Sequence, residues 1–305
     1  MNPLRIFSGY SCIHRKLTTV NQFYRRKKHR ASGGHHWLQL EEDNVETLKR
    51  PVSTTVALFL VAPLLAWAQV INLSTGLNYT TIQAAIDATQ TLAGHTISVS
   101  KGTFTGNITV TKGLTIIGAG IDSTLLRTSQ STVPVVTITA NNVTLKKLTV
   151  RDATSSGTAG IRLQSVSNVT IDSCSVTNNF RGVQLTSSSD NTISNSRIVS
   201  NIENGIVLIS SSNRNRITAN TVANTVGGIG DWTGNGINTG DQSSSATLIQ
   251  DNSIHGNAHS ALSVMPAQTI CKYGETPFTG TQTGSCLDGQ TGVQSRTTQS
   301  EIIPV

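Results

Sequence analysis

The sequence is poor in charged and aromatic side chains, and these shortages exclude several classes of protein. Of the 305 residues, 13% are charged, 4% are aromatic and 36% are hydrophobic. A disordered chain would carry more charge and fewer aliphatic residues. A coiled coil or helical bundle would be rich in Ala, Glu, Lys and Leu. The composition therefore favours a folded protein with a sizeable core that is not a helical bundle.

Excess positive charge is absent from most of the chain, although the whole sequence has a net charge of +7. Residues 1–68 hold ten Lys or Arg and four Asp or Glu, whereas residues 69–305 hold 13 Lys or Arg and 12 Asp or Glu. A nucleic-acid-binding domain needs a basic surface, so we expect no nucleic-acid partner for the second part. The basic run that includes Arg25, Arg26 and Lys27 indicates a disordered tail over residues 1–50. The alternative is an arm that binds nucleic acid or a membrane surface.

No uncharged run reaches the length of about 20 apolar residues that a membrane-spanning helix needs. Residues 51–68 follow Lys49 and Arg50 and end in a thirteen-residue apolar stretch, residues 56–68, that closes with Ala66-Trp67-Ala68. These features are typical of a secretory signal peptide, cut here before Gln69. Because such signals begin a chain, we expect the true start near residues 45–52, with residues 1–44 as upstream sequence. The alternative is a cytoplasmic tail and an uncleaved membrane anchor within residues 51–71.

Cysteine is scarce, and the position of the four cysteines agrees with export. Cys271 and Cys286 close a short loop near the C-terminus, which predicts a disulfide in an oxidising compartment. We therefore expect the protein to be secreted, periplasmic or at the cell surface.

Short aliphatic rows recur through residues 95–265, with a spacing typical of a repeat architecture. In each repeat a small residue, usually Gly, precedes the first row, and two further rows follow, separated by Ser, Asn, Asp and Gly. The first row is Ile161, Val183, Ile206, Ile237 and Leu262, the second contains Ile171, Ile193, Ile217 and Ile249, and the third is Val150, Val176, Ile198, Val222 and Ile254. Strands this short cannot bury themselves alone, but stacked coils share one core. The pattern predicts a solenoid with three strands in each coil.

Two groups of residues between the rows are interpreted as structural. When the repeats are aligned, five residues occupy equivalent positions of successive coils and form one column: Leu148, Cys174, Ser196, Asn220 and Asn252. Cys174 in this column is interpreted as a small inward hydrophobe, with a reactive thiol as the alternative. Asparagines follow the third row at 178, 179, 201, 224 and 257, where they suit tight corners because Asn tolerates the left-handed conformation.

The repeat resembles the right-handed parallel β-helix proteins of the pectin-lyase-like superfamily over about residues 71–265. Residues 78–88 look like the capping helix that opens such solenoids, with Ile82, Ala85 and Ile86 on one face. Residues 96–104 and 114–124 are similar to the first coils of pectin methylesterases, although Gly106 stands where that family has an acid. The resemblance implies an all-β right-handed parallel β-helix with a short N-terminal capping helix. We expect it over residues 69–268, followed by a cap and a loose tail over residues 269–305.

Enzymes of this superfamily act in a groove on the outer face of one sheet, and their chemistry needs acids there. Hydrolysis needs two carboxylates within about 5–10 Å, and lyases and epimerases need a base and a cation, often calcium. The outward residues expected beside the first row are not acidic; they are Thr137, Arg162, Gln184, Val207, Asn238 and Ser263. The signatures of polygalacturonases, pectate lyases, pectin methylesterases and alginate epimerases are not found. We therefore expect no standard polyuronate-processing catalysis, no metal site and no cofactor, with calcium as the one candidate cation.

One coil, which begins at Ile206, is about eight residues longer than its neighbours. Its excess, residues 227–236, is rich in Gly and holds Asp231, Trp232 and Asn235, and Asp241 follows. A loop on a rigid solenoid is a usual place for binding residues. Trp stacks on sugar faces, and Asp or Asn can bond hydroxyls or hold calcium. The alternative is a Gly-rich turn whose Trp covers the coil.

These observations predict an exported β-helix protein that binds a polysaccharide or a cell-surface partner. The candidate ligand-binding residues are Asp231, Trp232, Asn235, Asp241 and Arg162. Arg162, with Arg181 in a neighbouring loop, could bond an acidic glycan or be a solvated pair. The alternative function is a carbohydrate-active enzyme, a lyase, hydrolase or epimerase with an unrecognised site. A membrane is a partner only if residues 51–71 form an uncleaved anchor.

Overall fold

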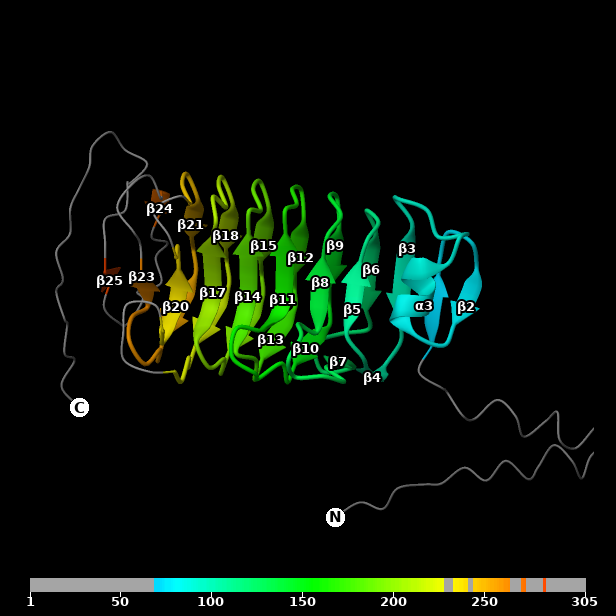
Figure 1. The fold of residues 1–305 in the computed structure, drawn as a ribbon, viewed down its shortest axis with the longest axis horizontal. Helices are drawn as coiled ribbons and strands as arrows, with labels where there is room; N and C mark the ends of the chain where they lie inside the picture. Colours follow the sequence, from blue (N-terminus) through cyan, green and yellow to red (C-terminus); the bar gives the residue numbers. More distant parts are fainter. Residues whose placement is uncertain (1–68, 228–232, 241–243, 264–269, 273–281, 284–305) are drawn as a thin grey trace, which may run out of the picture. The chain divides into compact units, whose positions relative to one another are not determined.

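The computed structural model describes residues 69–227, 233–240 and 244–263, and the backbone of residues 270–272 and 282–283 (Figure 1). The predicted tail and signal peptide, residues 1–68, lie outside the described residues. In the described part, successive coils stack side by side and strands dominate. No helix in this part is both long enough and apolar enough to cross a membrane.

Sheet A has the strand order β2-β1-β3-β6-β9-β12-β15-β18-β21-β24. Its strands are β1 (Val70–Asn72), β2 (Leu77–Tyr79), β3 (Thr96–Val99), β6 (Thr115–Gly118), β9 (Thr144–Lys146), β12 (Thr170–Asp172), β15 (Thr192–Ser194), β18 (Arg216–Thr218), β21 (Leu248–Gln250) and β24 (Ile270–Lys272). Strand β1 pairs antiparallel with β2 and β3, and the other pairs are parallel.

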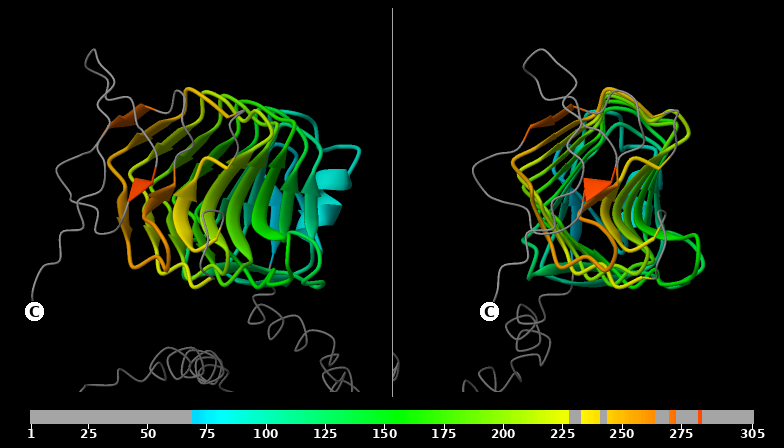
Figure 2. Two further views of the ribbon diagram at one scale, coloured as in Figure 1. Left: turned by 60° about the vertical axis from the view of Figure 1, so that its left-hand side comes forward. Right: turned by 90° about the vertical axis from the view of Figure 1, so that its left-hand side faces the viewer.

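Sheets B and C contain only parallel pairs. Sheet B is ordered β22-β19-β16-β13-β10-β7-β4 and sheet C is ordered β25-β23-β20-β17-β14-β11-β8-β5. Sheet B contains β4 (Gly102–Thr105), β7 (Thr124–Arg127), β10 (Thr149–Arg151), β13 (Ser175–Thr177), β16 (Arg197–Val199), β19 (Thr221–Ala223) and β22 (Ser253–His255). Sheet C contains β5 (Ile108–Val110), β8 (Val136–Ile138), β11 (Ala159–Gln164), β14 (Arg181–Thr186), β17 (Asn204–Ile209), β20 (Asn235–Asn238), β23 (Leu262–Ser263) and β25 (Gln282–Thr283). Figure 2 shows the three sheets as the sides of one coil.

The predicted aliphatic rows coincide with the three sheets, which confirms the parallel β-helix. Ile161 pairs with Val183, and Val183 pairs with Ile206, in the register expected for the first row. The third row pairs in the same way along sheet B, from Val150 to Ile254. These side chains are almost fully buried and belong to one hydrophobic core. Burial of this common core holds together strands that are too short to be stable alone.

The glycine that precedes four of the five first-row residues is explained by close packing, and Ala261 takes this place in the fifth repeat. A Cβ atom on Gly182 would lie 2.4 Å from the carbonyl oxygen of Gly205 and 2.7 Å from Cγ2 of Ile198. A Cβ atom on Gly205 would lie 2.5 Å from the carbonyl oxygen of Gly236. No side chain fits at these distances, so the coils can approach one another here only because the position is Gly.

Asparagines after the third row have two different roles. Asn178 and Asn224 have φ angles of 55° and 56°, the left-handed conformation that the sequence predicted for corners. Asn179 and Asn201 are instead fully buried. The Oδ1 atom of Asn201 accepts the backbone N–H of Asn179 at 3.1 Å, and its Nδ2 atom donates to the carbonyl oxygen of Val176 at 3.1 Å. The buried asparagines therefore satisfy backbone groups of the preceding coil.

The column that contains Cys174 satisfies backbone groups in the same way. Ser196 Oγ accepts the backbone N–H of Cys174 at 3.1 Å, and Asn220 Oδ1 accepts that of Ser196 at 3.0 Å. Asn252 Oδ1 accepts the N–H of Asn220 at 2.9 Å. Cys174 itself lies in the hydrophobic core with 1% of its surface exposed, as the sequence predicted.

Helix α3 (Ile82–Asp87) lies at the N-terminal end of the stack, and its inward face is the one predicted (Figure 1). Ile82, Ala85 and Ile86 are buried. The helix begins later than residue 78 because residues 77–79 pair with β1 as a strand. Gln83 attaches the helix to β5: its Oε1 accepts the backbone N–H of Thr109 at 2.8 Å, and its Nε2 donates to the carbonyl oxygen of Thr109 at 3.3 Å.

At the other end, strands of sheets A and C continue beyond residue 268. Strand β24 pairs in parallel with β21, and β25 pairs in parallel with β23. A cap and loose tail over residues 269–305 stay a prediction, because most of that stretch lies outside the described residues.

Candidate functional site

The outward row of sheet C, expected from the repeat alignment, is present in the predicted register. The paired residues are Thr109, Thr137, Arg162, Gln184, Val207, Asn238 and Ser263. Their exposure differs along the row, since Gln184, Val207, Asn238 and Ser263 are at most 7% exposed. Thr109 is exposed, and Thr137 and Arg162 are partly exposed. The accessible part of the row is therefore its N-terminal half, which ends at Arg162.

Arg162 lies in this half with its guanidinium group only partly engaged. Its Nη2 atom donates to the carbonyl oxygen of Gly157 at 2.7 Å and lies 3.4 Å from Oε1 of Gln184. Its Nε atom is buried and has no hydrogen-bond partner among the described residues. No carboxylate of the described part of the chain forms an ion pair with Arg162. A half-buried cation therefore lies on this face without a counter-ion from the described residues.

Arg181 lies beside Arg162 and has its own carboxylate partner. Its guanidinium group forms an ion pair with Glu203 in which Nη2 donates to Oε1 at 3.2 Å, and Nε donates to Oε2. Its Nη1 atom donates to Oε1 of Gln184 at 3.2 Å. Both arginines lie against the amide of Gln184, which is buried. The group of Arg162, Arg181, Gln184 and Glu203, which we call the arginine cluster, has two positive charges and one negative charge.

The pKa of Arg162 reflects its burial and the positive charge of the arginine cluster. Burial lowers the pKa of Arg162 below its ordinary value, and the positive charge of Arg181 lowers it further. Both effects disfavour the charged form of Arg162, and no described carboxylate pairs with it to oppose them. An anion that binds the accessible part of the Arg162 guanidinium group would offset both effects, because a nearby negative charge favours the charged form.

The sequence identified Arg162 and Arg181 but missed Glu203. Arg181 pairs with Asn204 in the register of β14 and β17, so Glu203 stands one residue before the position aligned with Arg181. The repeat alignment therefore places Glu203 in the neighbouring coil, next to the position of Arg181. It could not show that the side chain of Glu203 turns back towards Arg181, because side-chain direction at a corner depends on the backbone there.

Asn235 lies at the start of β20, at the end of the long connection after β19. Its side chain is fully buried, and its Oδ1 atom accepts the hydroxyl of Ser260 at 2.5 Å and lies 3.1 Å from Nδ1 of His259. Ser260 and His259 belong to the next coil. This geometry joins two coils, and the role of Asn235 as a sugar ligand stays a prediction.

Three of the predicted ligand-binding residues, Asp231, Trp232 and Asp241, lie outside the described residues, as does Cys286. Cys271 is described only through its backbone, as part of β24. The proposed loop site and the proposed disulfide are therefore predictions still. The described geometry places the start of that loop at the corner between sheets B and C, since β19 ends at Ala223 and β20 begins at Asn235.

Asp152, an acid elsewhere on the described surface, is engaged by three neighbouring donors. Asp152 accepts Nε of Arg127 at 2.5 Å, Nε of Arg151 at 3.1 Å and Nδ2 of Asn178 at 2.7 Å. Burial alone would raise the pKa of Asp152, but these hydrogen bonds outweigh it and the pKa is lowered. Within the described residues, no group of three His, Cys, Asp or Glu side chains is arranged to hold a metal ion.

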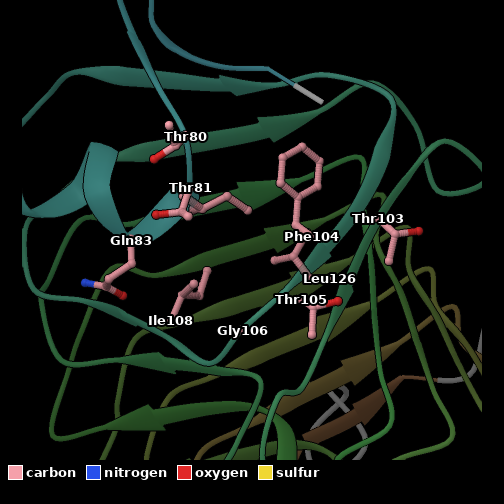
Figure 3. Close-up of a pocket in the computed structure, with 10 residues that line it drawn as sticks. Thr80, Thr81, Gln83, Thr103, Phe104, Thr105, Gly106, Ile108 and Leu126 are labelled. Atoms are coloured by element: carbon pink, nitrogen blue, oxygen red, sulfur yellow. The ribbon is translucent and has the colours of Figure 1, made fainter. Parts of the chain in front are cut away.

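A pocket of about 270 Å³ lies at the N-terminal end of the solenoid, between α3 and strands β4 and β5 (Figure 3). Its apolar lining is Ile82, Phe104, Ile108 and Leu126, and its polar lining is Thr80, Thr81, Gln83, Thr103 and Thr105. Gly106 completes it, and a Cβ atom there would meet nothing within 4 Å. The lining has no charged side chain, so the pocket suits an uncharged group, and it shares no residue with the arginine cluster.

Three sheets built mainly from parallel strands, with aliphatic rows inside and a polar outer face, define a parallel β-helix protein. The sequence supports the same class, because residues 92–241 and 135–298 match the family described as the right handed beta helix region. The chain belongs to this right-handed β-helix family, which confirms the fold expected from the pectin-lyase-like resemblance.

Relatives and similar structures were found beyond the family match. A cell surface glycoprotein of Methanothermus fervidus is 35% identical over 113 residues, which cover 37% of this chain and 18% of that protein. An alginate lyase from Paenibacillus sp. superposes with a TM-score of 0.47 and 19% identity, covering 63% of this chain and 70% of the lyase. A pectin methylesterase from Erwinia chrysanthemi superposes with a TM-score of 0.41 and 12% identity, covering 60% of this chain and 77% of the esterase. These two structures resemble the chain in fold alone.

Proposed function

We propose that this chain is an exported β-helix protein that binds an acidic polysaccharide on the outer face of sheet C. The observation that carries the proposal is the half-buried guanidinium group of Arg162, which has no carboxylate partner among the described residues. A carboxylate group of a glycan supplies the counter-ion. Arginine suits this role because its planar group bonds such anions through two N–H donors.

The neighbours of Arg162 favour binding of an extended chain. Thr137 and Thr109 continue the accessible row from Arg162 towards the N-terminal end, one strand at a time. Neighbouring strands lie about 4.8 Å apart, so hydroxyl groups recur along the solenoid axis at the scale of successive sugar rings. We propose that the acidic group binds at Arg162 while the adjoining sugars lie along the two threonines.

Export is part of the proposal. The basic flank and short apolar segment before Gln69 support it, as does the name of the relative from Methanothermus fervidus, a cell surface glycoprotein. The expected partner is therefore a glycan outside the cell, either free polysaccharide or a cell-surface glycan.

The test compares binding of the secreted protein to polygalacturonate, alginate and a neutral dextran, by isothermal titration calorimetry. The parent should bind one of the acidic polymers and ignore the dextran. Arg162→Gln should weaken this binding by about 10- to 100-fold, because hydrogen bonds to charged groups contribute about 1.5–3 kcal/mol each. Arg197→Gln is the matched control, since it removes the same charge from an exposed site on sheet B.

Two outcomes would overturn the proposal. Equal weakening by Arg162→Gln and Arg197→Gln would mean that only net charge matters. No binding by the parent to either acidic polymer would remove the substrate class. The same incubations, followed by absorbance of unsaturated products and assay of reducing ends, test the alternative that the protein is a carbohydrate-active enzyme.

A further inference from the structure

The sequence contains the N-glycan acceptor motif, Asn-x-Ser or Asn-x-Thr, at five positions that the proposed function does not use. They begin at Asn72, Asn78, Asn107, Asn142 and Asn168. An oligosaccharide attached through Nδ2 of Asn is bulky and needs a surface position. The structure separates the five asparagines sharply by burial and by the bonds that their side-chain amides make.

Asn142 and Asn168 occupy equivalent corners of consecutive coils. Both are exposed, and both have the left-handed conformation, with φ angles of 59° and 57°. Thr144 and Thr170, the hydroxyl residues of the two motifs, pair with each other as the first residues of β9 and β12. Neither asparagine side chain has a hydrogen-bond partner among the described residues, so a substituent on Nδ2 displaces no contact there.

Asn78 is also exposed, on the outermost strand β2 of sheet A. Its Oδ1 atom accepts Nε2 of Gln69 at 2.6 Å. Its Nδ2 atom donates to no described residue. A bond at Nδ2 therefore leaves the one contact of this side chain in place.

The other two asparagines have no room for a substituent. Asn72 is fully buried, and its Nδ2 atom donates to Oγ1 of Thr91 at 2.9 Å. Asn107 holds a surface loop: its Nδ2 atom lies within 3.4 Å of four oxygen acceptors, the shortest bonds being 2.8 Å to Thr128 and 2.8 Å to Pro134. A glycan on either nitrogen would replace one of its two N–H donors and so break at least one of these bonds, and a group that loses its hydrogen-bond partner on burial is costly.

We infer that Asn78, Asn142 and Asn168 are N-glycosylation sites and that Asn72 and Asn107 are not. The donor is an oligosaccharide linked to a polyprenyl phosphate carrier. A bond forms between Nδ2 and the anomeric carbon of the first sugar, the bond from that carbon to the carrier's phosphate oxygen breaks, and the phosphate leaves with its electron pair. The amide loses one proton to a base of the transferase. The inference rests on the export that is part of the proposed function.

The position of the two corner sites leaves the arginine cluster clear. Asn142 and Asn168 follow the ends of β8 and β11 and precede sheet A. Arg162 contacts Gly157 and lies beside Arg181, both at the other end of the sheet C strands. Glycans at the corner therefore extend from the opposite edge of the sheet, and the proposed binding face keeps its access.

The test is glycopeptide mass spectrometry on the full chain recovered from the extracellular fraction of its own host. Peptides with Asn78, Asn142 and Asn168 should carry an oligosaccharide mass, and those with Asn72 and Asn107 should be unmodified. Thr144→Val and Thr170→Val should each abolish the modification at the asparagine two residues earlier, although the asparagine is kept. Asn107→Gln should leave the glycan mass unchanged.

Unmodified Asn142 and Asn168 in the exported protein would overturn the inference, as would a glycan on Asn72 or Asn107. Such a result is distinguishable from failure of the proposed function, because binding of acidic polysaccharide is measured separately through Arg162→Gln. A protein that binds its polymer but carries no glycan refutes the modification alone.

Discussion

Replacing Asn220 by Ala removes a buried side chain whose amide bonds the coils on both sides of it. Its Oδ1 atom accepts the backbone N–H of Ser196 at 3.0 Å, and its Nδ2 atom donates to the carbonyl oxygen of Ile193 at 2.9 Å and to Oδ1 of Asn252 at 3.0 Å. The substitution leaves the Ser196 N–H and the Ile193 carbonyl buried without these partners. Each such group costs about 1–3 kcal/mol, so we expect a loss of about 2–6 kcal/mol in the free energy of unfolding.

Asn220→Ser separates the two contributions. Ser196, in the same column, accepts the N–H of Cys174 through its hydroxyl at 3.1 Å. A serine at 220 can therefore keep the acceptor for the Ser196 N–H while losing the donor to Ile193. We expect this variant to lose about half as much stability as Asn220→Ala.

Urea unfolding followed by circular dichroism measures both variants from their midpoints and slopes. Arg216→Ala is the control, because this exposed side chain lies on the outer face of sheet A in the same coil, and exposed substitutions stay within about 0.5 kcal/mol. A loss for Asn220→Ala no larger than that of the control would refute the reasoning. Equal losses for the Ser and Ala variants would refute the division between acceptor and donor.

Three further outcomes follow from the described contacts. Gly182→Ala should lower the melting temperature, because its Cβ atom would lie 2.4 Å from the carbonyl oxygen of Gly205 and overpacking costs about 1–3 kcal/mol; an unchanged melt would contradict this. A hydrogen bond from Asn195 lowers the pKa of Asp172 despite its burial. Ionised Asp172 therefore stabilises the fold at pH values above the ordinary carboxyl pKa, and this contribution is lost as pH falls through the lowered pKa. Asp172→Asn should therefore destabilise the protein at about pH 7, and this effect in thermal melts should shrink as pH falls below the ordinary carboxyl pKa of about 3.9. Burial raises the pKa of Cys174 to about 12, so iodoacetamide at about pH 8 should label it only in denaturant. Rapid labelling of Cys174 in the native protein, located by peptide mass spectrometry, would contradict its place in the core.

The fold could be predicted from the sequence because its determinants are local and repeated. Each coil brings the same order of small residue, aliphatic rows and polar corners, so an error at one position is corrected by the others. The pairing of Ile161 with Val183, and the outward placement of Arg162, followed directly from that alignment. The inward face of α3 followed from helical periodicity in the same way.

The candidate site could be predicted only in part, because access and side-chain direction depend on neighbours outside the repeat pattern. Alternation placed Gln184 and Asn238 on the outer face, yet both are buried there. The bond between Glu203 and Arg181 depends on the shape of a corner, which the spacing of the rows does not specify. The pocket beside Phe104 depends on the way α3 lies against β4 and β5.

The side-chain bonds between successive coils limit how a gene for this protein can change in length. Asn220 and Ser196 each bond a backbone N–H of the coil before them, so duplication or deletion of the whole coil that holds either residue keeps its side chain opposite a backbone N–H. Insertion of a few codons within a strand would shift all later donors out of line. The connection from β19 to β20 spans residues 224–234, whereas that from β13 to β14 spans residues 178–180. Such corners are where partial insertions can accumulate during evolution without disturbing the coils on either side.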